Sequence, residues 1–146
     1  MSGLIIRVRN MGRLQSKVKK LPTDIQDGVV EGLRGIAPLM EAEIQEDIRT
    51  GPRSGNIVTR YNPERIHQAS APGEVPANDR GTLADSIEVE VDPIQFNLTI
   101  AALADHAPDL EYGTRWMLPR PFLRPALTRW RDRIINAIHK AIKGRL

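Results

Sequence analysis

One long amphipathic pattern constrains the fold of this chain more than any other feature of its sequence. Seven apolar residues recur at intervals of three or four, the spacing that places them on one face of a helix: Ile25, Val29, Leu33, Ile36, Met40, Ile44 and Ile48. A helix of roughly 25 residues is about 37 Å long at the standard rise per residue. A chain of 146 residues is most simply one domain, so we expect residues 1–146 to pack along this helix.

The same stretch carries signals for how the helix begins and how it packs. Thr23 is predicted as the N-cap, with Gln26 completing a capping box. Pro38 predicts a kink. Three glycines in the first half either have no special role or allow another helix to approach closely: Gly28, Gly32 and Gly35.

Further along, the hydrophobic period changes to two. Residues 87–91 and 94–100 each alternate apolar with polar side chains, which predicts two antiparallel strands with one buried face. A short β-prone run, 4–8, and a helical spacing over 14–21 precede the long helix, and residues 127–142 predict a terminal amphipathic helix. We therefore expect an α+β fold, with the long N-terminal helix and the C-terminal helix packed on one face of a small antiparallel sheet.

Residues 50–80 lack a helical period and are rich in glycine and proline. A stretch of this length in a small domain is usually functional, so we expect a projecting loop or arm. Within it, residues 56–61 and 65–69 predict a hairpin around Asn62-Pro63. That arm would carry three arginines free to reach a neighbouring subunit: Arg53, Arg60 and Arg65.

The connector 110–127, which we call the strap, reads LEYGTRWMLPRPFLRPAL. Its three prolines exclude an ordinary strand or helix interior and indicate a rigid, partly apolar segment that positions the terminal helix. We consider two roles for its side chains, contact with an adjoining subunit or packing within the same domain. The apolar anchors would be Trp116, Met117, Leu118 and Phe122, and the donors to carboxylates would be Arg120 and Arg124.

Charge divides the chain unevenly. Residues 115–146 hold nine basic residues and one acidic residue, a local charge of +8, and the remainder carries −5. The terminal helix is thus expected to meet an acidic surface or a polyanion, or to be a solvated basic face. There is no cysteine, which excludes disulfides and thiolate sites. Without a membrane-spanning run or a signal-peptide pattern, we expect the protein to be cytoplasmic when made.

Residues that could carry catalysis are sparse. His67, His106 and His139 have no partner at metal-ligand spacing, and the densest ionisable cluster, within 105–111, matches no known spacing. We therefore predict no catalytic residue, no cofactor and no metal site. A metal-dependent hydrolase using that cluster is the third hypothesis. DNA binding through phosphate contacts is a stronger one, although the low aromatic content of 4% argues against a base-stacking surface.

Two stretches carry a resemblance to a known family. SAPGEVPANDRGTLADSI, residues 70–87, and APDLEYGTRWMLPRPFLRPAL, residues 107–127, resemble the head–tail joining, or tail-completion, proteins of long-tailed phages and prophages, which are related to the minor tail protein Z of lambdoid phages. Together with the preceding long helix, the similarity covers most of the chain. The departures are small: Tyr112 where phenylalanine is usual, Val75 where a second proline is common, and Asn78-Asp79-Arg80 for a typical aspartate-threonine.

The resemblance implies a non-enzymatic structural protein of the virion, assembled in the host cytoplasm. It would form a six- or twelve-fold ring in the neck, which completes the tail, mediates head–tail joining and leaves a channel for DNA. Its implied partners are further copies of itself, the head connector or closure protein, the tail terminator or tail tube protein, and non-specifically the passing DNA, but no membrane. The alternative is a small basic DNA-binding accessory protein acting through backbone electrostatics.

Overall fold

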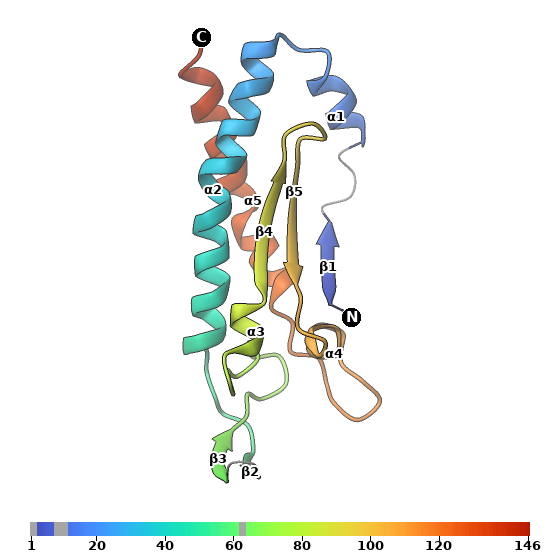
Figure 1. Ribbon diagram of the computed structural model, residues 1–146, viewed down its shortest axis with the longest axis vertical. Coiled ribbons are helices and arrows are strands. Elements are labelled where there is room, and N and C mark those ends of the chain that lie inside the picture. The colour runs from blue at the N-terminus through green and yellow to red at the C-terminus, as the bar shows by residue number, and fades with distance from the viewer. Residues whose placement is uncertain (1–2, 8–11, 62–63) are drawn as a thin grey trace.

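The structure is a computed structural model that describes residues 3–7, 12–61 and 64–146 (Figure 1). Its helices are α1 (Gly12–Val18), α2 (Thr23–Thr50), α3 (Thr82–Asp85), α4 (Ala107–Tyr112) and α5 (Leu123–Lys143). Its strands are β1 (Leu4–Arg7), β2 (Ile57–Arg60), β3 (Arg65–Gln68), β4 (Ile87–Asp92) and β5 (Asn97–Ala102). The predicted α+β class is confirmed, with the long helix and the terminal helix packed together against a small antiparallel sheet.

The three-stranded sheet has the order β1-β5-β4, with both pairings antiparallel. The expected β4–β5 pair is confirmed, and it buries Ile87, Leu98 and Ile100 on one face. The second strand begins at Asn97 rather than at residue 94, because a turn occupies the intervening residues. The Asp92 carboxylate accepts the N–H groups of residues 94 and 95 in that turn, at 2.8 and 3.0 Å.

The helix α2 follows the predicted apolar stripe and continues through Pro38. The predicted cap was wrong: Thr23 is the first helical residue, and Pro22 is the N-cap with φ −53° and ψ 150°. The Gln26 amide donates to the carbonyl of Leu21 at 2.8 Å rather than reaching an N–H group. A proline fixed in extended geometry already separates α2 from the preceding turn, so no side-chain cap forms here.

Two of the three glycines on α2 allow the close approach of α5. A Cβ at Gly32 would lie 2.7 Å from the Ile138 Cα, and one at Gly28 would lie 3.2 Å from the Ile142 Cα. A Cβ at Gly35 would meet nothing within 4 Å. The packing explanation therefore holds for Gly28 and Gly32, whereas Gly35 has no such role.

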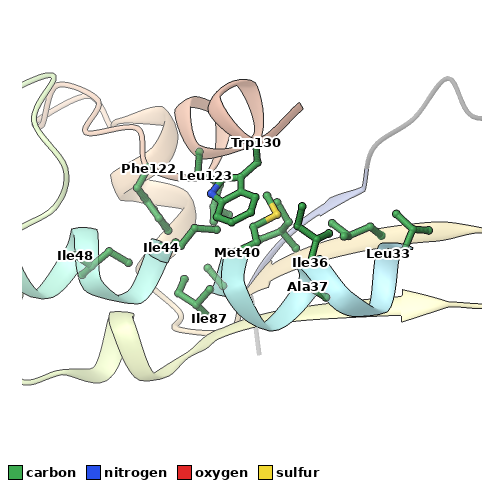
Figure 2. Close-up of a cluster of buried hydrophobic side chains, with 14 of the residues drawn as sticks. Leu33, Ile36, Ala37, Met40, Ile44, Ile48, Ile87, Phe122, Leu123 and Trp130 are labelled. Carbon is green, nitrogen blue, oxygen red and sulfur yellow. The ribbon is translucent and has the colours of Figure 1, made fainter. Parts of the chain in front are cut away.

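The core lies between these two helices and the sheet (Figure 2). Its largest fully buried side chains come from α2, β4, β5 and the start of α5: Leu33, Met40, Ile44, Ile48, Ile87, Ile100 and Leu123. On the outer edge of β4, the Glu41 carboxylate of α2 accepts the Val89 N–H at 2.9 Å. This bond satisfies one of the N–H groups that an edge strand leaves without a strand partner.

The segment 50–80 holds the predicted hairpin. Strand β2 pairs with β3 in antiparallel register from Ile57↔Gln68 to Arg60↔Arg65, and the hairpin projects at the end of the molecule where α2 stops. The predicted turn, Asn62-Pro63, lies outside the described residues, as does Val8 in the predicted first strand. The early helix α1 ends at Val18 rather than continuing to residue 21.

Candidate assembly surfaces

A buried carboxylate binds the backbone where the strap enters α5. Glu111 in α4 is 3% exposed, and its Oε2 accepts the N–H groups of Phe122 at 2.8 Å and Leu123 at 3.0 Å. Its Oε1 accepts the N–H of Arg124 at 3.0 Å. A carboxylate on the first N–H groups of a helix satisfies donors that have no partner within the helix and interacts favourably with the helix dipole. Glu111 thus fixes where α5 begins.

This arrangement bears on two points raised by the sequence. Both ends of the strap are helical, because residues 110–112 belong to α4 and residues 123–127 form the start of α5. Of the ionisable cluster at 105–111, Glu111 is engaged as the cap of α5. Within the described part of the chain, no group of three or more histidine, aspartate or glutamate residues is arranged to hold a metal ion.

Arg120 joins the strap to the loop at 70–77. Its Nε and Nη2 both donate to the Ser70 carbonyl at 3.1 Å, and its backbone N–H donates to the carbonyl of Leu110 at 2.7 Å. Ser70 itself is 2% exposed. Because two N–H groups of the guanidinium converge on this one oxygen, the direction of the side chain is fixed as well as its distance. Arg120 therefore binds within its own chain, as the second of the two roles considered for the strap requires.

A second set of contacts closes the same junction. The Gly73 N–H donates to the Pro119 carbonyl at 3.1 Å. The Glu74 carboxylate accepts the Ala71 N–H at 2.7 Å and a hydrogen bond from the Ser54 hydroxyl. Hydrogen bonds from Ser54 and from the Ala71 backbone lower the pKa of Glu74 below its ordinary value. The two stretches that carry the family resemblance are thus joined by hydrogen bonds between residues 70–73 and 119–120.

The apolar candidates of the strap separate into two groups. Phe122 is 4% exposed and packs in the core (Figure 2), so it is not at the surface. Trp116 is 82% exposed and Leu118 is 65% exposed, while Met117 between them is half-buried. Only Trp116 and Leu118 therefore stand clear of the domain as candidate contacts with another molecule.

The two remaining strap arginines lie over aromatic rings. The Arg124 guanidinium is 4.6 Å from the centroid of the Tyr112 ring, and Arg115 is 4.2 Å from that of Trp116. Such cation–π pairs contribute about 0.5–1 kcal/mol at exposed sites. Arg124 is exposed, so its predicted role as a donor to another subunit stays a prediction.

The arginines of the arm are engaged within the chain. Arg65 pairs with Asp79 at 2.6 Å, Arg60 reaches the same carboxylate at 3.5 Å, and the Nδ1 of His67 lies 3.6 Å from it. Burial alone would raise the pKa of Asp79, but the hydrogen bond from Arg65 and the nearby positive charges outweigh it and lower that pKa. Arg53 donates to the Arg49 carbonyl at 3.4 Å. Asp79, three residues before α3, therefore holds the arginines of the hairpin within the chain rather than leaving them free.

The basic helix α5 meets its acidic surface on α2 of the same chain. Arg133 pairs with Glu43 at 2.6 Å, and Arg129 pairs with Glu43 at 3.3 Å and with Asp47. At the far end, Arg145 pairs with Glu31 at 2.7 Å. Burial acts to raise the pKa of Glu43, but the hydrogen bond and charge of Arg133, with those of Arg129, lower it. Three of the nine basic residues of the segment 115–146 are therefore paired with acids of the same chain.

Among the described residues, the cations of α5 with neither an ion pair nor an aromatic ring as partner are Arg131, Lys140 and Lys143, all exposed. Sequence reasoning missed the pairing of α2 with α5. The sequence did contain a signal for this pairing. Glu43 and Asp47 are four residues apart, as are Arg129 and Arg133, so each pair lies on one face of its helix.

None of the described helices combines the length and apolar character that crossing a membrane requires. Comparison of the chain with protein-family models, with curated proteins and with solved structures gave no match.

Proposed function

We propose that this protein is a structural subunit of the neck of a tailed bacteriophage or prophage. It forms a ring, alone or on a tail, that completes the tail and joins it to the filled head around a central channel for DNA. The ring has six or twelve copies, and its neighbours are the head connector or closure protein and the tail terminator or tail tube protein. It acts by assembly and not by catalysis.

The observation that carries this proposal is the junction between the loop at 70–77 and the strap. The resemblance to tail-completion proteins rests on two stretches separated by about 20 residues, 70–87 and 107–127. In the fold, the Arg120 guanidinium donates to the Ser70 carbonyl and the Pro119 carbonyl accepts the Gly73 N–H, so hydrogen bonds join the two stretches. A signature that maps onto one physical unit is stronger support than two separate motifs.

The exposed side of that unit fits an assembly role. Trp116 and Leu118 project from it at 82% and 65% exposure, although an isolated soluble domain gains nothing by exposing a large aromatic side chain. Exposed apolar side chains on a rigid support are typical of residues that become buried in an interface.

The proposal is tested by the state of association of the purified protein and by its binding to tails or connectors. Native mass spectrometry and electron micrographs should show closed rings, alone or after addition of tails. A protein that remained strictly monomeric and bound neither tails nor connectors would contradict it.

The second candidate function is non-specific DNA binding, favoured by the unpaired Arg131, Lys140 and Lys143 on α5. It predicts binding to duplex DNA that weakens steeply with salt. Failure to bind DNA at low salt would remove it. The internal pairing of Arg129, Arg133 and Arg145 leaves fewer cations for phosphates than the sequence implied.

A further inference from the structure

A rigid loop presents Trp116 to solvent. The loop closes through the Thr114 N–H, which donates to the Met117 carbonyl at 2.8 Å. Gly113 before it has φ +76°, and a Cβ there would lie 2.7 Å from the Met117 carbonyl oxygen. The conformation therefore needs glycine at this position. A loop fixed in this way loses little conformational freedom when it binds.

The side chains of this loop combine apolar surface with positive charge. Trp116 and Leu118 are the apolar part, and the Arg115 guanidinium lies 4.2 Å above the Trp116 ring. Tryptophan and arginine are the residue types most enriched among those that dominate binding energy at protein interfaces. A partner surface for the loop should therefore offer an apolar recess bordered by carboxylates. We call residues 114–118 the knob.

Two grooves in the described part of the chain are compared as partners for the knob. The groove between α2 and α5 has a volume of about 630 Å³, but Lys140 and Arg145 line it, and its one carboxylate, Glu31, already pairs with Arg145. Arg115 would meet positive charge there. Like charges brought together at an interface oppose association.

The second groove lies on the face of the sheet turned away from the helices, with a volume of about 460 Å³. Its apolar lining includes Ile5, Ala101 and Leu103, of which Ile5 is 52% exposed and Leu103 is 47% exposed. Its charged lining consists of three carboxylates from β4: Glu88, Glu90 and Asp92. No arginine, lysine or histidine is among the described residues that line it.

We propose that the knob of one copy docks in this sheet groove of the next copy. Arg115 would face Glu88 and Glu90, neither of which has an ion-pair partner among the described residues, while Trp116 covers the apolar lining. The contact joins two different surfaces, so it is heterologous, and repetition of it closes a ring when the rotation allows. This inference rests on the proposed ring and identifies the surfaces that would form it.

Crosslinking between two differently substituted chains tests this contact. The natural chain has no cysteine, so each substitution introduces the only thiol. Trp116→Cys protein is mixed with Thr99→Cys protein under assembly conditions and treated with a short thiol-specific crosslinker. The control is a mixture of Trp116→Cys with Lys143→Cys, an exposed site near the end of α5. We expect dimer bands from the first mixture at several times the yield of the second.

Truncation and charge exchange give independent readouts. Trp116→Ala should weaken association by about tenfold or more, whereas Tyr61→Ala, an aromatic residue 74% exposed on the arm, should leave association unchanged. Arg115→Glu should weaken association, and adding Glu88→Arg and Glu90→Arg should restore it. Matched urea midpoints would show that these exposed substitutions leave the monomer folded.

The outcomes separate this contact from the ring itself. The knob contact is overturned if the parent protein and Trp116→Ala assemble equally well, or if both crosslinking mixtures react alike. Either result leaves the proposed ring intact. If the parent protein does not assemble at all, with or without tails and connectors, the proposed function falls together with the contact.

Discussion

Replacing Glu111 by glutamine should loosen the attachment of α5 to the strap. The carboxylate accepts three backbone N–H groups with its two oxygens, at 2.8 to 3.0 Å, and the residue is 3% exposed. Glutamine has one acceptor oxygen, so at least one N–H group at the start of α5 loses its partner. The NH2 group that replaces the other oxygen is itself a donor and cannot compensate.

The magnitude follows from two contributions. An unsatisfied buried donor costs about 1–3 kcal/mol, and losing a negative charge at a partly buried helix N-terminus costs up to about 2 kcal/mol. These contributions share the same atoms and are not strictly additive. We therefore expect Glu111→Gln to reduce the free energy of unfolding by about 3 kcal/mol, which is large against a typical total of about 5–15 kcal/mol.

Urea denaturation followed by tryptophan fluorescence measures this loss. The protein concentration is held fixed, because association adds to apparent stability. The matched control is Glu46→Gln, which makes the same chemical change at an exposed position of α2 and should change stability by less than about 0.5 kcal/mol. If Glu111→Gln also fell within about 0.5 kcal/mol of the parent, the carboxylate would not be the anchor of α5, and the reasoning would be refuted.

Three further predictions test other parts of the structure. Gly32→Ala should lower the free energy of unfolding by about 1–3 kcal/mol, because the added Cβ would lie 2.7 Å from the Ile138 Cα. Gly35→Ala places its Cβ in open space and should be neutral or stabilising. Thermal melts of the two variants test this difference. Arg120→Met should release the loop at 70–77, and limited proteolysis should then cut there faster than in the parent. Because paired arginines lower the pKa of Glu43 below 4.5, its ion pairs stabilise the fold at neutral pH, and that contribution is lost as pH falls through the folded-state pKa. The melting temperature of Glu43→Gln should therefore fall less between pH 7 and about pH 3 than the melting temperature of the parent. An equal fall in the two proteins would contradict the pairing.

The spacing of hydrophobic residues along the chain was enough to predict most of the fold. The stripe from Ile25 to Ile48 became α2, and the alternation at 87–91 became β4, because a single buried face determines each pattern. The hairpin at 57–68 followed from its turn residues and flanking β-prone segments. These signals are local, so they survive in a single sequence.

What the sequence did not reveal depends on tertiary contacts. Glu111 read as one acid in a cluster, because its role as a cap exists only once α4 and α5 are brought together. The basic helix was expected to meet an acidic surface or a polyanion, and only the tertiary structure shows that an acidic surface lies on α2 of the same chain. Of the strap candidates, Phe122 and Trp116 look equally apolar in sequence, yet one is 4% and the other 82% exposed. Only the direction of each side chain distinguishes them.

The most direct test of the central proposal is the mass of the native particle. Native mass spectrometry of the purified protein, alone and after incubation with tails or connectors, should give multiples of 16.3 kDa that correspond to a closed ring of six or twelve copies, with a central hole in electron micrographs. A mass of one chain under every condition, with no association with tails or connectors, would contradict the account.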